Sequence, residues 1–272
     1  MATAAASQAK DVLDLQGRLR RAVESLSPPA RPAPRNLPYQ QSPGALALVL
    51  TFWADGFVRD LERLGSLLAA ARQAETLEVA TLPLEEAFWR VDAACEKLRS
   101  LVFCGLGEPR AVIAAEAGFD RKEATRLQKK ALRRLETLAK SDVQAAELLR
   151  HYRDLRPALV YRDQVAHTLS AIRQTFVMPV ESVYFGEDLE VSRVRHHLHA
   201  PCYTGVDGTP QGRLQHALKV AEAAAVSLVE AGGAAAEVLK RHGVLGPFPT
   251  VFHVNGRAQW DDPRDVSGSN ES

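Results

Sequence analysis

The stretch LLRHYRDLRPALVYRDQVAHTLSAIRQTF, residues 148–176, decides the fold that the sequence predicts. Pro157 suits the first turn of a helix, because the N–H that proline lacks has no partner there. Apolar side chains then recur at three- and four-residue steps. They are Ala158, Tyr161, Val165, Leu169, Ile172 and Phe176. One apolar face of this kind is typical of an amphipathic helix that packs within an all-α protein.

The polar side chains of this helix fall away from the apolar stripe. At about 100° per residue, Arg162 lies at the edge of the stripe and His167 lies on its opposite side. Asp163 comes one turn before His167, so its carboxylate is in reach of the imidazole and raises its proton affinity. Arg162 and His167 diverge on a regular helix, and a site shared by two chains removes that difficulty. A guanidinium and an imidazole together suit chemistry at a phosphodiester.

The spacing of Arg162 and His167 within YRDQVAH resembles the R-x4-6-H motif of the HEPN superfamily. Members of this family are small helical bundles that usually dimerise, and active members are metal-independent endoribonucleases of defence or toxin–antitoxin systems. The resemblance implies that Arg162 neutralises the scissile phosphate, that His167 serves the proton transfers and that Asp163 orients His167. It also implies RNA as the ligand, a homodimer, no cofactor, and an antitoxin or other protein as partner. Glu96 would be a further acid near the site, or a surface charge.

A second segment, GEPRAVIAAEAGFDRKEATRLQKKALRRLETLAK at residues 107–140, resembles the helix-turn-helix of sigma factors. Gly118 stands at the expected turn and Asp120 at the expected helix cap. The resemblance implies DNA as the partner and a second helix that lies in the major groove. The residues expected to face DNA are Arg121, Lys122, Thr125, Arg126 and Lys129. Ala117 and Ala124 depart from the pattern, and the alternative is that this basic helix is the outer face of the same bundle.

Both interpretations place nucleic acid against the same part of the chain. Residues 120–173 contain 13 Lys or Arg against seven Asp or Glu, although the net charge of the whole chain is only +1. Such a local excess favours a polyanionic partner, and a solvated helix face is the alternative. Arg150, Arg153 and Arg156 precede the motif and extend a phosphate-binding surface in the HEPN-like interpretation.

The composition, 46% hydrophobic and 25% charged over 272 residues, predicts a soluble globular protein. Three scattered cysteines indicate a reducing cytoplasm rather than a disulfide framework. His197, His199 and Cys202 lack a matching second pair of ligands, so no metal site is predicted. No signal peptide and no membrane-spanning run are evident, and no membrane partner is expected.

The rest of the chain predicts an all-α bundle of about five main helices over residues 43–246. Its HEPN-like core takes residues 83–176 and 211–241. A mobile arm at 1–42, with a helix at 6–25 and a proline-rich linker, precedes the bundle, and a tail at 247–272 with a turn at Asn255–Gly256 follows it. Further helices are predicted at 44–78, at 81–103 with Thr81 as cap, and at 211–241 with a break at Gly232–Gly233. Residues 177–210 predict a long loop.

Three functions follow from these patterns. The leading hypothesis is an HEPN-like endoribonuclease or RNA-binding protein, which requires Arg162 and His167 together. The alternative is a helix-turn-helix DNA-binding regulator, which requires the basic helix. A non-catalytic helical scaffold requires neither.

Overall fold

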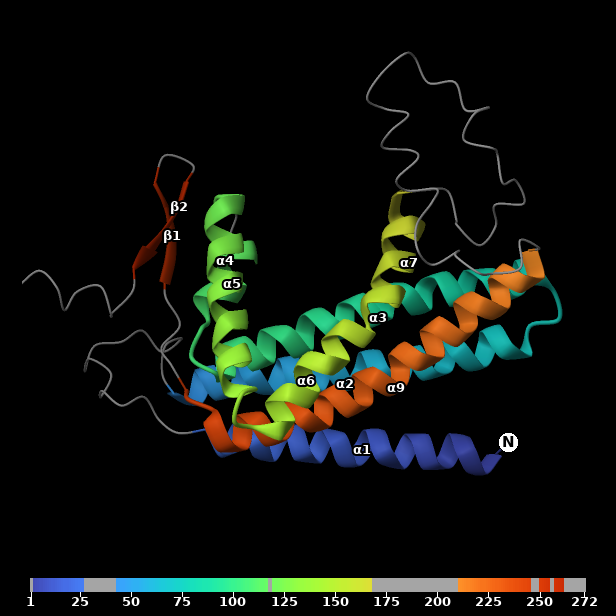
Figure 1. Ribbon diagram of the computed structural model, residues 1–272, viewed down its shortest axis with the longest axis horizontal. Coiled ribbons are helices and arrows are strands. Elements are labelled where there is room, and N and C mark those ends of the chain that lie inside the picture. Colours follow the sequence, from blue (N-terminus) through green and yellow to red (C-terminus); the bar gives the residue numbers. More distant parts are fainter. Residues whose placement is uncertain are drawn as a thin grey trace, which may run out of the picture. The chain divides into compact units, whose positions relative to one another are not determined.

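The computed structural model describes residues 2–26, 43–116, 119–167, 210–245, 250–254 and 257–261. These residues confirm the predicted all-α class and add one small hairpin (Figure 1). The helices are α1 (Ala2–Glu24), α2 (Pro43–Gln73), α3 (Leu77–Gly105), α4 (Arg110–Glu116), α5 (Arg121–Leu138), α6 (Val143–Asp154), α7 (Arg156–His167) and α9 (Pro210–His242). The predicted proline-rich linker and the predicted loop at 177–210 lie outside the described residues.

Contacts between residues divide the chain into two compact units. Unit 1 comprises Met1–Val58, Glu96–Arg150 and Glu230–Ser272, and unit 2 comprises Arg59–Cys95 and His151–Val229. Four helices, α2, α3, α6 and α9, continue from one unit into the other. A long helix with one continuous apolar stripe can therefore contribute residues to both units, and the stripe by itself does not indicate this.

Unit 1 incorporates α1, which the sequence assigns to a mobile arm. The buried apolar residues of this segment are Val12, Leu15, Leu19, Ala22, Val23 and Leu26. A Cβ atom at Gly232 of α9 would lie 2.7 Å from Phe57 Cε1 and 3.1 Å from Leu15 Cδ2. The helix α9 therefore continues through Gly232 and Gly233, where a break is predicted, because the absent side chain permits this close packing.

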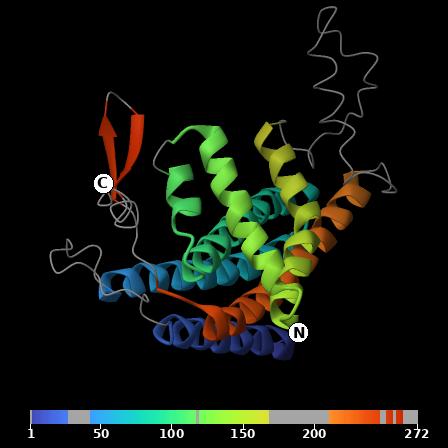
Figure 2. The same cartoon turned by 60° about the vertical axis from the view of Figure 1, so that its left-hand side comes forward.

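The helices α4 and α5 of unit 1 lie side by side (Figure 2). The carboxylate of Asp120 accepts a hydrogen bond of 2.7 Å from the backbone N–H of Lys122, which confirms the predicted cap of α5. The face of α5 that packs inward consists of Leu127, Ala131 and Leu135. Gly118, at the predicted turn, lies outside the described residues.

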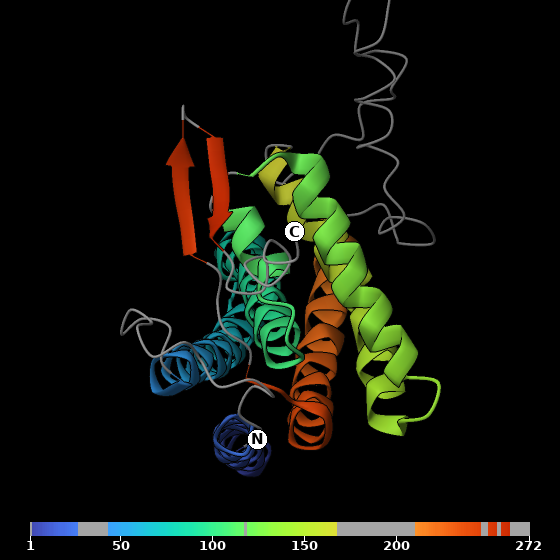
Figure 3. The ribbon, with the colours of Figure 1, turned by 90° about the vertical axis from the view of Figure 1, so that its left-hand side faces the viewer.

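The strands β1 (Thr250–Val254) and β2 (Arg257–Asp261) form an antiparallel hairpin in unit 1 (Figure 3). Their register pairs Val254 with Arg257. This pairing leaves a two-residue connection, as the predicted turn requires. The turn residues Asn255 and Gly256 themselves lie outside the described part of the chain.

The helix α3 begins four residues before the predicted start. Thr76 Oγ1 accepts a hydrogen bond of 3.3 Å from the N–H of Val79, and Pro83 lies inside the helix. The prediction that Thr81 caps this helix is wrong, and Thr81 is buried instead. Pro83 is tolerated in the second turn because it removes a single backbone hydrogen bond close to the helix end.

Unit 2 anchors α7 through Tyr161, whose side chain is fully buried. The rings of Tyr161 and Phe88 stack with centroids 4.8 Å apart and planes 9° apart. The Tyr161 hydroxyl lies 2.6 Å from Nδ1 of His216 on α9. The helices α3, α7 and α9 thus meet around one tyrosine, and Arg162 follows it directly in the chain.

Candidate nucleic-acid site

The motif helix α7 begins at Arg156 with Pro157 in its first turn, as predicted. It extends to His167, so the R-x4-H residues lie on one helix. The side chain of Arg162 is 27% exposed, which agrees with its predicted place at the edge of the apolar stripe. The side chain of His167 lies outside the described residues, and its role in the site stays a prediction.

Two carboxylates hold the Arg162 guanidinium. Arg162 Nη2 donates to Asp92 Oδ1 of α3 at 3.0 Å, and Arg162 Nη1 lies 2.8 Å from Asp163 Oδ1. Asp92 is the more sheltered partner, with 20% of its side chain exposed against 55% for Asp163. Asp163 therefore pairs with Arg162 in this structure, whereas the sequence predicts that it orients His167.

The indole of Trp89 is the third group beside Arg162. The guanidinium carbon lies 5.7 Å from the centroid of the indole ring, within the range of a cation–π interaction. Trp89 nevertheless remains 46% exposed. Arg162 Nε is buried and has no hydrogen-bond partner among the described residues. An unsatisfied buried donor costs free energy, so an acceptor that reaches it is favoured.

Tyr161, which precedes Arg162 in the chain, is held in place by His216 and Phe88. Burial lowers the pKa of the His216 imidazole, and the positive charge of Lys219 lowers it further. The ring is therefore neutral near pH 7 and can accept the Tyr161 O–H at Nδ1. Because Tyr161 is fixed by this bond and by its stacking on Phe88, the backbone that carries Arg162 is fixed as well.

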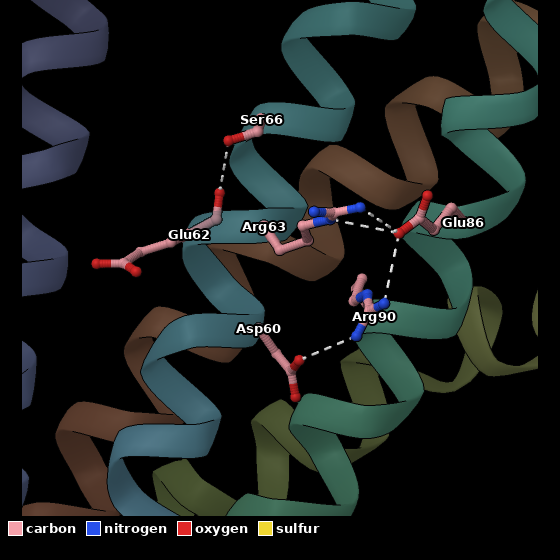
Figure 4. Close-up of polar contacts among 6 residues, drawn as sticks. All are labelled: Asp60, Glu62, Arg63, Ser66, Glu86 and Arg90. Carbon is pink, nitrogen blue, oxygen red and sulfur yellow. Dashed lines mark hydrogen bonds and ion pairs between the residues drawn. The ribbon is translucent and has the colours of Figure 1, made fainter.

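In unit 2, α3 is tied to α2 by a set of four charges (Figure 4). Arg90 lies 3.5 Å from Asp60 through Nη1 and 3.4 Å from Glu86 through Nη2. Arg63 Nη2 lies 3.2 Å from the same Glu86 oxygen. Two arginines and two acids offset one another, so this set positions α3 without adding net charge beside Trp89.

The other predicted site residues lie on α5 in unit 1. Arg121, Lys122, Arg126 and Lys129 are all exposed and line an open hollow together with Asp120 and Thr125. Their exposure agrees with a helix face that could meet a nucleic acid. No ion pair holds Arg121, Lys122 or Lys129 within the part of the chain that the structure describes.

Arg126 differs from its neighbours on α5. It donates two hydrogen bonds, 2.8 and 2.6 Å long, to the carboxylate of Glu123. This contact raises the pKa of Arg126 and lowers the pKa of Glu123. The charge of Arg126 is thus already offset, and a phosphate would have to displace Glu123 to bind it, which none of the three other cations requires.

The arginines that precede the motif are also exposed. Arg150 donates hydrogen bonds of 2.9 and 2.6 Å to Glu147, one helical turn earlier. Arg153 in α6 and Arg156 at the start of α7 lie on the surface of unit 2. Arg153 and Arg156 are therefore exposed side chains of the same unit as Arg162.

Two residues of this site, Asp92 and Trp89, are not among those that the sequence predicts. The sequence offers Glu96 as the acid near the motif or as a surface charge, and Glu96 is exposed and pairs with Arg99. Trp89 and Asp92 stand three residues apart, so they share a helix face. That spacing is a usable signal, but only the packing of α3 beside α7 in unit 2 shows that the face meets Arg162.

Comparison with known proteins yields no family model, curated protein or solved structure that matches this chain. Across the described residues, no group of three or more His, Cys, Asp and Glu side chains is placed to hold a metal ion. Within the same ranges, none of the helices combines the length and apolar character needed to cross a membrane. The resemblance to HEPN proteins thus rests on the sequence motif alone.

Proposed function

We propose that this protein is an HEPN-like RNA-binding protein that cleaves RNA without a metal ion. The observation that supports the proposal most directly is the fixed position of Arg162, which Asp92 and Trp89 hold while the second carboxylate, Asp163, is more exposed. A donor that is already positioned stabilises developing negative charge without reorganising during the reaction.

The proposed reaction uses the two motif residues in separate roles. Arg162 binds a non-bridging oxygen of the scissile phosphate, and His167 removes the proton of the neighbouring 2′-hydroxyl. The 2′-oxygen then bonds to phosphorus while the bond from phosphorus to the 5′-oxygen breaks. A protonated imidazole returns a proton to that leaving oxygen, and the products are a 2′,3′-cyclic phosphate and a 5′-hydroxyl.

The two carboxylates beside Arg162 suggest the order in which phosphate binds and His167 is oriented. A phosphate displaces Asp163 more readily than Asp92, because Asp163 is the more exposed of the two. The released Asp163 stands one turn before His167 and becomes free to orient it. A regular helix turns Arg162 and His167 about 140° apart, so a second copy of the chain completes the site at one phosphate. We expect this homodimer to act in the cytoplasm, with an antitoxin or similar protein as its regulator.

The test is cleavage of labelled total RNA in excess chelator. Arg162→Ala and His167→Ala should each lower the rate about 100-fold or more, since each removes a group that acts on the reacting phosphodiester. Arg59→Ala, which removes an exposed arginine of α2 in the same unit, should leave the rate unchanged. Thermal unfolding of all variants checks that they fold. Equal cleavage by Arg162→Ala and Arg59→Ala would contradict the proposal.

A second function, duplex DNA binding through α5, is supported by the packing of α4 against a capped α5 with an exposed basic face. In that case Arg121, Lys122 and Lys129 face the DNA. Binding of duplex DNA that survives Arg162→Ala and is lost when these three residues become Gln would favour it. A protein that folds but shows neither activity would be a helical scaffold.

A further inference from the structure

Trp89 has an unusual position for a large aromatic side chain of α3. Its neighbour Phe88 is fully buried against Tyr161, as expected for a core residue, whereas Trp89 is nearly half exposed. One side of the indole is occupied by the Arg162 guanidinium. Leu82, two turns earlier on the same helix face, is exposed as well. The apolar surface beside the arginine is thus open to a ligand.

We propose that Trp89 stacks against an unpaired nucleobase, and that the Arg162 site therefore takes single-stranded RNA rather than duplex RNA. This inference rests on the proposed function of Arg162 as a phosphate ligand. The guanidinium and the indole lie 5.7 Å apart, so one nucleotide or two adjacent ones can place a phosphate on Arg162 and a base on Trp89. A base within a duplex is stacked on its neighbours and presents no free face.

The electrostatics of the surrounding α3 surface permit this binding. The nearby acids Asp92 and Glu86 are each paired with arginine, Asp92 with Arg162 and Glu86 with Arg63 and Arg90 (Figure 4). Asp163 is a second carboxylate on Arg162. In the proposed function the phosphate displaces Asp163, so the charges of Asp92 and Glu86 stay offset by arginine when RNA binds. Every nucleobase has an aromatic face, so stacking on Trp89 gives affinity with little preference for sequence.

The first measurement is fluorescence of the full chain with Trp89 as its single tryptophan, in the double variant Trp53→Phe, Trp260→Phe. The probe is a single-stranded oligonucleotide with 2′-O-methyl sugars, which cannot be cleaved because it lacks the 2′-hydroxyl. Stacking of a base should quench the Trp89 emission as the probe is titrated. A blunt duplex of the same sequence should quench it far less. Equal quenching by both would overturn the preference for single strands.

The second measurement is the affinity for the same probe. Trp89→Leu keeps apolar bulk but removes the ring, and it should weaken binding about 5-fold to 100-fold. Trp89→Phe should retain most of the affinity. Phe52→Leu provides the matched control, because it removes an exposed aromatic ring from α2 in the other unit and should have no effect.

Changing the RNA distinguishes stacking of a base on Trp89 from a role in which Trp89 only positions Arg162. Probes with one abasic nucleotide, moved along the strand, should include a position that weakens binding to the wild type but not to Trp89→Leu. Weakening of both proteins by the same factor at every position would overturn the stacking role. If Arg162→Ala abolishes cleavage while Trp89→Leu binds and cleaves as the wild type does, the inference fails and the proposed function stands. If the wild type binds no RNA, both fail.

Discussion

The Arg162 region of unit 2 and the α5 surface of unit 1 use cationic side chains in opposite ways. Arg162 is mostly buried, and two carboxylates and an indole fix its guanidinium. On α5, Arg121, Lys122 and Lys129 are exposed and have no ion pair among the described residues. We propose that the first arrangement selects a ligand by geometry, whereas the second would attract any polyanion by charge.

This difference teaches why a count of positive charges is a poor guide to function here. The basic excess of residues 120–173 includes both regions and suggests one surface. The structure assigns them to different units and offsets several of the charges locally, as in the pair of Arg126 with Glu123. Variants that act on one region alone should therefore separate a catalytic site from an electrostatic one.

After the motif residues themselves, Asp92 has the largest expected effect. Asp92→Ala should lower RNA cleavage up to about 100-fold, because the Arg162 guanidinium loses the more sheltered of its two carboxylate partners and is no longer fixed. Asp163→Ala should lower it less. In the proposed mechanism Asp163 orients His167 and favours its protonation, so the acid limb of the Asp163→Ala rate profile should move to lower pH.

The readout for Asp92 is a pH–rate profile for each variant. Asp92→Ala should keep the acid limb where the wild type has it, whereas Asp163→Ala should shift that limb. An Asp92→Ala rate equal to that of the Arg59→Ala control would show that the fixed position of Arg162 does not matter to cleavage.

The next effect concerns the aspartates that begin α5 and α6. The Asp142 carboxylate at the start of α6 is only 6% exposed and accepts hydrogen bonds from the N–H groups of Gln144 and Ala145, at 2.8 and 3.1 Å. His242 Nε2 and Arg241 Nη1 each lie 2.8 Å from its other oxygen. Asp142→Ala should therefore lower the free energy of unfolding by about 2 kcal/mol or more.

The matched variant Asp120→Ala removes an exposed cap with one backbone hydrogen bond and should cost about 0.5–1 kcal/mol. Urea unfolding at pH 7 measures both values. Equal losses would show that burial of the Asp142 carboxylate adds nothing to its role as a cap.

The same aspartate predicts how stability depends on pH. Burial alone raises the pKa of Asp142, but the His242 hydrogen bond, the two backbone N–H groups and the charge of Arg241 outweigh it and leave the pKa below its ordinary value. Its stabilising contribution is present above the aspartate pKa of the unfolded chain and is lost as the pH falls through the lower folded value. Unfolding of wild type and Asp142→Ala should therefore converge in acid, and a constant difference down to the lowest pH would contradict this.

The smallest effects belong to α5. Each of Arg121→Gln, Lys122→Gln and Lys129→Gln should weaken nucleic-acid binding only a few-fold and lower the slope of log affinity against log salt by about 1. Arg126→Gln should change the slope less, because Glu123 already offsets its charge. Binding titrations at several salt concentrations measure these slopes. Unchanged slopes in all four variants would remove α5 from the nucleic-acid surface.

Local sequence signals predicted several features that depend on few neighbours. The cap Asp120, the proline in the first turn of α7 and the two-residue turn between the strands follow from short-range hydrogen bonding and backbone geometry. The same signals erred where packing decided the outcome. Thr81 is a good cap by type but is buried, and Gly232 marks a close approach of side chains instead of a helix end.

The sequence by itself determined that the chain is all-α, that a basic region precedes the motif, and that Arg162 and Asp163 are neighbours on one predicted helix. These properties follow from helical periodicity and composition, which are local. Only the tertiary structure decided that Asp92 and Trp89, about 70 residues away in the chain, lie beside Arg162 in unit 2. The physical reason is that an ion pair between helices depends on how their apolar faces pack, and many packings satisfy the same periodicity.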